Sequence, residues 1–261
     1  MDLNLSGKVA LVVASSKGLG KAMARQLAME GCDVMMTSRD AEQLEAARQE
    51  LLPVAEGRVE CHICDITRPE DIKVLVEATR NRLGSIDILI NNSGGPAGGG
   101  FEKMDDAAWQ TAFELTLLNY IRMIREVLPD LKKKGGRIIN VTSSSIKQPI
   151  PGLILSNVYR MGILGLGKSL AEELAPFNIR VNTVAPGRVA TDRLAYLDQL
   201  KADQRGISRE EIAAETVQTI PLKRYGDPEE FAKVVTFLAS DASSYVTGSA
   251  IMIDGGMVKG F

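Results

Sequence analysis

The sequence predicts a three-layer α/β/α domain in which helices cover both faces of a doubly wound parallel sheet of about seven strands. Two observations predict this fold. Short, nearly all-apolar runs recur along the chain, as is typical of strands buried on both faces. A longer segment with apolar residues at helical spacing follows most of these runs. The length of 261 residues and this continuous alternation suit a single domain of residues 1–261, and the 45% of hydrophobic residues can form a substantial core.

The first half of the chain alternates between strands and helices. We expect strands at 8–14, 33–38, 58–64 and 86–91, and helices at 21–30, 41–52 and 69–83. The run from Lys8 to Ala14 is almost wholly apolar, as a central parallel strand requires. Gly31 follows the first helix, Pro53 ends the second and Pro69 begins the third, all in favoured positions.

The second half has longer helices and two irregular segments. We expect helices at 106–134, 155–175 and 229–238, and strands at 137–141, 180–184 and 250–253. The glycine-rich stretch 94–100 is incompatible with regular structure, so we expect a mobile loop. Residues 191–222 are polar and weakly patterned, and we interpret them as a lid that covers a substrate.

Charge and composition argue against several classes of function. The formal net charge of −2 gives no electrostatic case for binding nucleic acid or an anionic membrane. The N-terminal residues lack the pattern of a secretory signal, and no run of about 18 apolar residues could span a bilayer. Three cysteines do not make a disulfide framework, which favours a cytoplasmic location.

Cys61 and Cys64 have C-x-x-C spacing and enclose the only histidine, His62. A redox site would need a helix N-terminus to lower a thiol pKa, and a zinc site would need a second pair of ligands. Neither is evident, because the segment has the pattern of a strand. We interpret the pair as structural and expect no metal.

Residues 14–20 (A-S-S-K-G-L-G) lie between the first predicted strand and the first helix. Glycines at this position let the backbone approach the phosphates of a dinucleotide, and the helix N-terminus offers unpaired N–H groups. A glycine turn can also serve only to reverse the chain. Its place in the first strand–helix–strand unit favours phosphate binding.

Several further motifs occur in a characteristic order. They are Asp65-Ile66, N-N-S-G at 91–94, P-G-R-V-A-T at 186–191, V-T-G at 246–248 and D-G-G at 254–256. With the glycine turn, they make the whole chain resemble the short-chain dehydrogenase/reductase family, particularly the members similar to 3-oxoacyl-carrier-protein reductases. The resemblance implies a Rossmann-type nucleotide-binding fold, with Ala14 in place of the family's first glycine. The residues that it assigns to the cofactor are Ala14, Ser16, Lys17, Gly18, Leu19, Gly20, Asp65, Ile66, Asn92, Ser93, Gly94, Arg160, Pro186, Gly187, Val189 and Thr191.

The end of the second predicted strand indicates which dinucleotide binds. An NAD site places a carboxylate there, which binds the ribose 2′-hydroxyl and repels a 2′-phosphate. Ser38 occupies this position and Arg39 follows it. Arg39 and Lys17 could both pair with a 2′-phosphate, although either alone could be a solvated surface charge. Together they favour NADP(H).

The catalytic pattern departs from the one that the resemblance implies, which is an Asn, a Ser, a Tyr and a Lys. Ser143 matches the family's serine, which would bind a carbonyl oxygen, although it could also be an ordinary strand-end hydroxyl. Ser156 and Arg160 occupy the tyrosine and lysine positions of Y-x-x-x-K at the usual interval from Ser143. Thr116 stands at the position of the asparagine.

These replacements change the expected chemistry. A serine hydroxyl is a poor general acid without a partner base, and arginine keeps its charge and does not shuttle protons. Ser156 and Arg160 are four residues apart, so we expect them to share a helix face. Tyr159 points about 100° away from Arg160 around the helix, so it could reach the site or serve in packing. Asn119 and Tyr120 are weaker candidates.

Two hypotheses follow for the function. The first is an NADP(H)-dependent oxidoreductase that acts on a small carbonyl or alcohol substrate, with water or Tyr159 as the proton source. The second is a non-catalytic NADP(H)-binding sensor or partner subunit, because a fold does not establish an activity. A purely structural protein would leave Lys17, Ser38 and Arg39 unexplained. The resemblance also implies a homodimer or homotetramer.

Overall fold

The computed structural model describes residues 2–260 and contains one seven-stranded parallel sheet of order β3-β2-β1-β4-β5-β6-β7. The strands are β1 (Val9–Val12), β2 (Asp33–Ser38), β3 (Val59–Ile63), β4 (Ile88–Asn91), β5 (Gly136–Val141), β6 (Ile179–Pro186) and β7 (Ala250–Ile253). The strand order reverses between β1 and β4. In such sheets a ligand binds beyond the carboxyl ends of the strands at this reversal.

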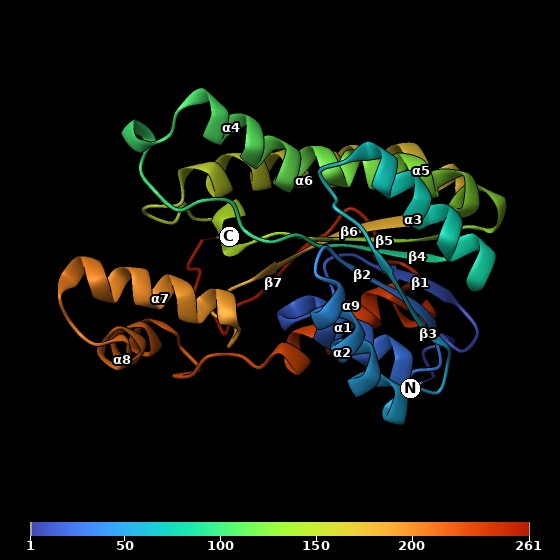
Figure 1. The fold of residues 1–261 in the computed structure, drawn as a ribbon, viewed down its shortest axis with the longest axis horizontal. Coiled ribbons are helices and arrows are strands. Elements are labelled where there is room, and N and C mark those ends of the chain that lie inside the picture. The colour runs from blue at the N-terminus through green and yellow to red at the C-terminus, as the bar shows by residue number, and fades with distance from the viewer. Residues whose placement is uncertain (1, 261) are drawn as a thin grey trace.

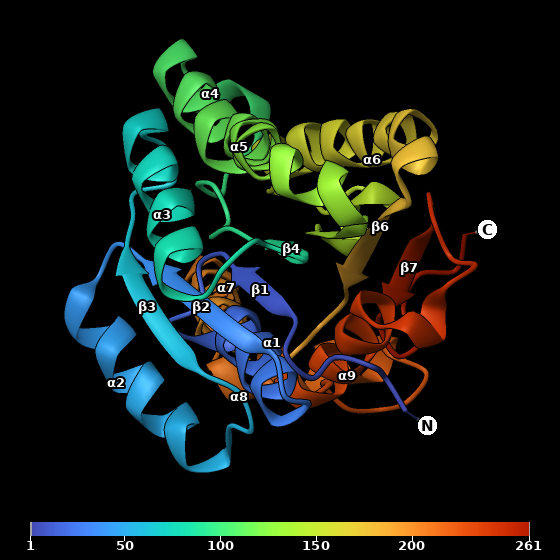
Figure 2. The ribbon, with the colours of Figure 1, turned by 90° about the vertical axis from the view of Figure 1, so that its right-hand side faces the viewer.

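Helices form a layer on each face of the sheet (Figures 1 and 2). One layer holds α1 (Gly18–Met29), α2 (Ala41–Leu51) and α9 (Pro228–Ala239). The other holds α3 (Pro69–Arg82), α4 (Asp106–Phe113), α5 (Asn119–Lys134) and α6 (Ile154–Leu174). Helices α7 (Asp192–Arg205) and α8 (Arg209–Thr219) project to the left in Figure 1, beyond the sheet. These layers confirm the predicted α/β/α fold.

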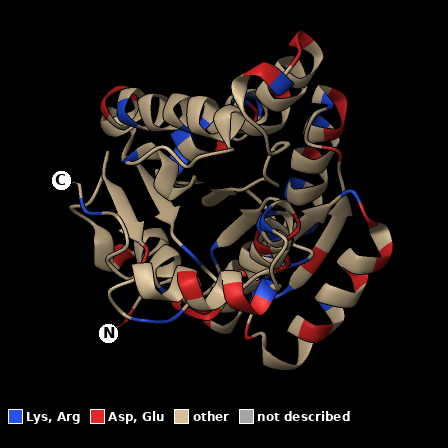
Figure 3. Cartoon of the chain, turned by 90° about the vertical axis from the view of Figure 1, so that its left-hand side faces the viewer, with Lys and Arg blue, Asp and Glu red and all other residues tan. Residues whose placement is uncertain are grey.

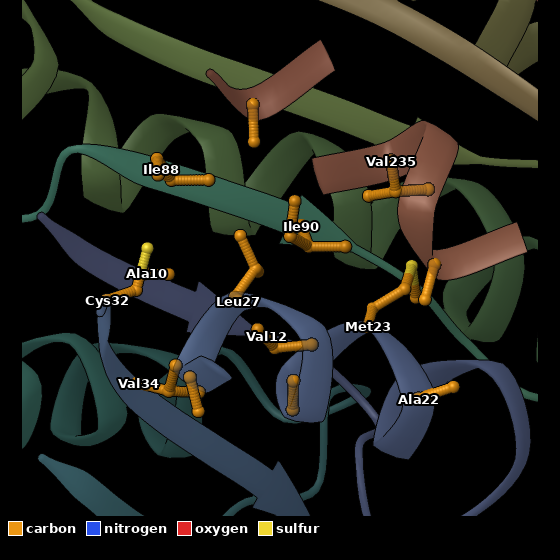
Figure 4. Close-up of a cluster of buried hydrophobic side chains, with 14 of the residues drawn as sticks. Ala10, Val12, Ala22, Met23, Leu27, Cys32, Val34, Ile88, Ile90 and Val235 are labelled. Carbon is orange, nitrogen blue, oxygen red and sulfur yellow. The ribbon is translucent and has the colours of Figure 1, made fainter. Parts of the chain in front are cut away.

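The core consists of two clusters of buried side chains, one on each face of the sheet. Successive strand residues point to opposite faces, so Val12 packs with α1 and α9 while Leu11 packs with α3 and α5. Figure 4 shows the first cluster, in which Met23 and Leu27 of α1 lie close to strand residues such as Ile90. Burial on both faces explains why the strands are continuous apolar runs.

Most predicted bounds lie within two residues of the observed ones, and three segments differ by more than that. Helix α1 begins at Gly18 rather than at residue 21, because the glycine turn continues directly into the first helical turn. The predicted helix 106–134 contains a π-helical segment, Glu114–Leu118, between α4 and α5. The segment 191–222 holds two helices, α7 and α8, which its weak apolar pattern did not predict. The glycine-rich stretch 94–100 has no helix or strand, as expected, apart from a bridge between Gly99 and Leu153.

Short 3₁₀ helices complete the structure. They are Leu52–Val54, Phe101–Lys103, Ser144–Ile146, Ala175–Phe177 and Asp241–Ser243. Figure 3 shows basic and acidic residues mixed along the helices on the side from which α7 and α8 project. Among residues 2–260, no helix is both long enough and apolar enough to cross a membrane.

Candidate active site

A cleft of about 650 Å³ opens at the carboxyl ends of the strands. The predicted cofactor residues that line it are Ala14, Ser16, Lys17, Gly18, Leu19, Gly20, Ser38, Arg39, Ile66, Asn92, Ser93, Gly94, Arg160, Pro186, Gly187, Val189 and Thr191. The predicted catalytic residues Ser143, Ser156 and Arg160 also line it. Asp65 and Tyr159 do not. The structure therefore brings together residues from both halves of the sequence.

The glycine turn has the geometry of an anion-binding site. Gly18 adopts a left-handed backbone with φ of 54°, and no side chain caps the N-terminus of α1. The first-turn N–H groups of α1 are therefore free for an anion such as a phosphate. Gly20 packs so closely that an added Cβ would lie 2.0 Å from the carbonyl oxygen of Ala14. A glycine is required at that position.

Ala14 occupies the strained position of the same turn. Its φ of 52° is left-handed, a conformation that costs a residue with a Cβ roughly 1–2 kcal/mol. The side-chain amide of Asn92 donates to the Ala14 carbonyl oxygen at 3.2 Å, which fixes the turn against the end of β4. The added methyl group is thus accommodated with some strain.

The end of β2 forms the outer part of the cleft. The Ser16 hydroxyl lies 3.1 Å from that of Ser38, which joins the glycine turn to the end of β2. Lys17 and Arg39 are both exposed, and neither forms a salt bridge with a carboxylate of the described residues. This part of the cleft therefore offers two cations without a direct acidic partner.

Asp65 lies beside this region without lining the cleft. Its carboxylate accepts hydrogen bonds from the backbone N–H and the hydroxyl of Thr67, at 3.0 and 2.8 Å. Burial alone would raise the pKa of Asp65, but these bonds and the charges of Arg39 and Arg68 lower it overall. The carboxylate fixes the loop after β3, while the neighbouring Ile66 faces the cleft.

Ser156 and Arg160 form a buried pair at the inner end of the cleft. Both lie on α6, with exposed fractions of only 8% and 7%. The Nε of Arg160 donates to the Ser156 Oγ at 3.2 Å, and Nη1 donates to the carbonyl oxygens of Val141 and Thr142 at 3.2 and 3.0 Å. The expectation that the pair shares a helix face is confirmed. The end of β5 holds the guanidinium in place.

The Ser156 oxygen already accepts a hydrogen bond from the Arg160 guanidinium. The hydroxyl can therefore donate its proton to a ligand oxygen in the cleft. Ser143 is similar, since its Oγ accepts from the Ser145 N–H at 3.2 Å at the start of a short 3₁₀ helix. Two serine hydroxyls of the cleft are thus available as donors.

Tyr159 lies away from the cleft. Its hydroxyl donates to the Trp109 carbonyl oxygen at 3.0 Å, and its ring packs against Trp109 and Phe113 with centroid distances of 5.8 Å. The rotation of about 100° from Arg160 points the ring toward α4 instead of the cleft. The structure therefore corrects its assignment as a catalytic candidate and gives it a packing role.

The remaining polar candidates are buried behind the cleft. The Tyr120 hydroxyl donates to the Val141 carbonyl oxygen at 2.7 Å, and burial raises the pKa of this phenol. The Asn119 side chain accepts from the Tyr120 N–H. Thr116 lies in the π-helical segment, and its hydroxyl has no hydrogen-bond partner among the described residues. None of the three lines the cleft.

Sequence reasoning missed a group of cleft residues on and near α7. Arg193, Leu194, Tyr196 and Leu197 face the cleft, together with Ile150 and Leu153 from the segment before α6. The signal that could have revealed α7 is its N-cap, because Thr191 caps the Leu194 N–H and Asp192 follows in the first turn. Segment 191–222 does border the cleft, as the expected lid should.

Cys61 and Cys64 lie within and directly after β3, so the prediction of a strand is confirmed. Burial, followed by the charges of Asp71 and Asp65, raises the pKa of Cys64 to about 12. Burial also raises the pKa of Cys61. Both groups therefore favour the neutral thiol, which is a poor nucleophile and a poor metal ligand.

Comparisons with known proteins agree with this geometry. Residues 13–258 match the family model described as Enoyl-(Acyl carrier protein) reductase. The chain is 36% identical over 259 residues to the 3-oxoacyl-[acyl-carrier-protein] reductase FabG of Thermotoga maritima, covering 98% of this chain and 100% of that protein. It is also 36% identical to human Dehydrogenase/reductase SDR family member 4, over 97% of this chain and 88% of that protein.

Solved structures give the same result at the level of the backbone. L-sorbose reductase from Gluconobacter frateurii superposes with a TM-score of 0.95 at 32% sequence identity, covering 100% of both chains. A single-residue variant of actinorhodin polyketide ketoreductase superposes with a TM-score of 0.92 at 32% identity, over 96% of this chain and 97% of that chain. The chain is therefore a member of the short-chain dehydrogenase/reductase family.

Proposed function

We propose that this protein is an NADP(H)-dependent oxidoreductase that interconverts a carbonyl and an alcohol at a non-standard active site. The observation that carries the proposal is the cleft that joins an uncapped helix N-terminus to the Ser156–Arg160 pair. Two structural relatives support it, because L-sorbose reductase was solved with NADPH and L-sorbose, and actinorhodin polyketide ketoreductase with NADPH.

The residues present fit the cofactor. The free N–H groups at the start of α1 suit a pyrophosphate, and Lys17 and Arg39 suit the 2′-phosphate that distinguishes NADP(H) from NAD(H). Ser38 presents a hydroxyl where an NAD site would present a carboxylate. Pro186 to Thr191, and Arg160, would hold the nicotinamide end. When bound, NADPH supplies a hydride to the carbonyl carbon.

The chain would stabilise the charge that develops on the carbonyl oxygen. Ser143 and Ser156 would donate hydrogen bonds to this oxygen, which strengthen as it becomes an alkoxide. The alkoxide is about as basic as a serine oxygen, so the Ser156 proton can pass to it. Arg160 Nε would then stabilise the negative charge on the Ser156 Oγ until water returns a proton. Arg160 itself stays charged throughout.

We propose α7 and α8 as the substrate lid, with residues 1–261 as one domain around the cofactor.

We also propose a homodimer or homotetramer. Val158 and Met161 on α6 are 46% and 47% exposed, which is consistent with an apolar contact face. Light scattering after gel filtration would test this, and a monomer at micromolar concentration would contradict it.

A second candidate function is a non-catalytic NADP(H) sensor. The replacement of the usual Tyr and Lys by Ser156 and Arg160 favours it, because serine is a weak acid at neutral pH. The sensor hypothesis predicts that NADPH binds but no carbonyl compound is reduced. If the double variant Ser156→Tyr, Arg160→Lys reduced a carbonyl compound that the unmodified protein does not, this result would support the sensor hypothesis. Abolition of an existing activity would support the non-standard site.

Binding and turnover test the proposal separately. NADPH fluorescence titration, with NADH alongside, should show tighter binding of NADPH by at least about tenfold, because a phosphate–arginine pair contributes about 1.5–3 kcal/mol. Equal affinities, or no binding, would contradict the cofactor assignment. Consumption of NADPH with ketones, aldehydes, quinones or acyl thioesters would then distinguish the enzyme from the sensor.

A further inference from the structure

Arg193 is a second guanidinium at the inner end of the cleft, and the mechanism above does not use it. It lies in the first turn of α7, half-buried, and its Nη2 donates to the Pro96 carbonyl oxygen at 2.9 Å. Gly95 makes room for it, because a Cβ at Gly95 would lie 2.7 Å from the same Nη2. The loop after β4 and the first turn of α7 therefore meet at this side chain.

Arg193 has no anionic partner in the described chain. Its hydrogen bond is to a neutral carbonyl oxygen, and the ring of Tyr196 lies 5.4 Å from the guanidinium carbon. Burial, and the nearby charge of Arg160, lower its pKa. The neighbouring acidic residue on the cleft wall, Asp192, is exposed and its charge is screened by solvent.

Two cations that repel one another inside a partly buried cleft are unfavourable unless an anion lies between or beside them. Arg160 uses its Nε and Nη1 on Ser156 and on the end of β5, whereas Arg193 has a single hydrogen bond to residues 2–260. The other N–H groups of Arg193 form no hydrogen bond with the described residues, although Nη2, Cζ and Nε lie against Gly95. A carboxylate accepts two of them in a bidentate pair.

The same cleft also has an apolar part. Ile150 and Leu153 precede α6, and Leu194 and Leu197 belong to α7. A ligand that fits both features has a short aliphatic body and one anionic end. We infer that the substrate is a keto acid or hydroxy acid whose carboxylate binds Arg193, an inference that rests on the proposed function.

The anion could come from the substrate or from the cofactor, since the pyrophosphate is also anionic. Thr191 lies close to the glycine turn, because a Cβ at Gly18 would be 3.5 Å from the Thr191 Cγ2. Arg193 itself contacts Gly95 and Pro96, beyond the Asn92–Gly94 segment assigned to the cofactor, and Tyr196 of α7, so we assign it to the substrate. The experiment distinguishes the two sources.

The test compares acids with neutral amides of the same shape. The dissociation constants of 2-, 4- and 5-oxohexanoate and of the corresponding oxohexanamides are measured by calorimetry, with and without saturating NADP⁺. At least one acid should bind about 10- to 100-fold more tightly than its amide, as for hydrogen bonds to a charged group. Arg193→Met should abolish this preference and Arg193→Lys should retain part of it. NADPH affinity should change less than about threefold in both variants.

Arg209→Met is the matched control, because Arg209 is an exposed arginine on α8 that does not line the cleft. It should keep the preference for acids. Equal binding of acid and amide, or a preference that survives Arg193→Met, would overturn the inference while leaving NADPH binding intact. A selective tenfold loss of NADPH affinity in Arg193→Met would assign Arg193 to the cofactor and also overturn it. Absence of NADPH binding in the unmodified protein would contradict the proposed function instead.

Discussion

The two ends of the cleft differ in how far they follow the family pattern. At the outer end, the glycine turn, Ser38 and Arg39 are of the types that we propose for an NADP(H) site, with Ala14 in place of the first glycine of the turn. At the inner end, the proposed site has the Ser156–Arg160 pair at the positions where the family resemblance leads us to expect a tyrosine and a lysine. Binding of a dinucleotide depends largely on backbone N–H groups and on cations, whereas proton transfer depends on a particular side chain. Under the proposed function, the cleft therefore meets the usual requirements for binding and differs in those for proton transfer.

The largest effect is expected at the inner end, for Ser156→Ala. Loss of this hydroxyl removes one donor to the carbonyl oxygen, and removal of one such donor typically lowers kcat about 10²- to 10³-fold. KM and NADPH affinity should change little, because Arg160 keeps its bonds to Val141 and Thr142. Steady-state kinetics with the substrate found in the turnover screen would measure this effect.

Ser169→Ala provides the control on the same helix, because Ser169 is exposed and does not line the cleft. Its kcat should equal that of the unmodified protein. A Ser156→Ala variant with unchanged kcat would show that Ser156 is not the donor, and would remove the main chemical difference between the two ends.

The next largest effect is expected at the outer end, for Arg39→Ala. The variant loses a charge-assisted contact to the 2′-phosphate, so the Kd for NADPH should rise about 10- to 100-fold. The Kd for NADH should stay the same, because NADH has no phosphate at this position. Fluorescence titration of both cofactors measures the difference.

Arg125→Ala is a suitable comparison, since Arg125 is an exposed arginine of α5 outside the cleft. It should leave both affinities unchanged. An equal loss of NADPH and NADH affinity in Arg39→Ala would mean that Arg39 contacts a part common to both cofactors. Arg39 would then not determine which of the two cofactors binds.

The sequence predicted the sheet and the outer end of the cleft because both depend on local patterns. Apolar runs such as Leu11 and Val12 are required by burial on both faces, and glycines such as Gly20 are required by close backbone contact. These constraints act within a few residues of the chain, so they are visible in the sequence.

The inner end was less predictable because its geometry comes from contacts between distant segments. The periodicity of α6 predicted that Ser156 and Arg160 share a face, but it did not show that Arg160 is held by the end of β5. The placement of Tyr159 depends on Trp109, 50 residues earlier. Helix α7 has a weak apolar stripe, so the contact of Arg193 with Pro96 could not be inferred from periodicity.

The smallest effect is expected for Cys64, which lines the outer end of the cleft beside Ile66. Burial, with the charges of Asp71 and Asp65, raises its pKa to about 12, so at pH 8 it remains a neutral thiol. Iodoacetamide reacts with the thiolate and should label Cys64 at pH 8 far more slowly than the same thiol in the protein unfolded by urea.

Saturating NADPH should lower this slow rate only a few-fold further, because the thiol is already largely unreactive. Mass spectrometry of peptides after timed quenching reads each cysteine separately. Labelling of native Cys64 at the unfolded rate would mean that the outer end of the cleft is open and hydrated instead of packed. The free energy of dinucleotide binding would then have to come mainly from the glycine turn, Lys17 and Arg39. Arg39→Ala should in that case raise the Kd for NADPH by the upper end of its expected range.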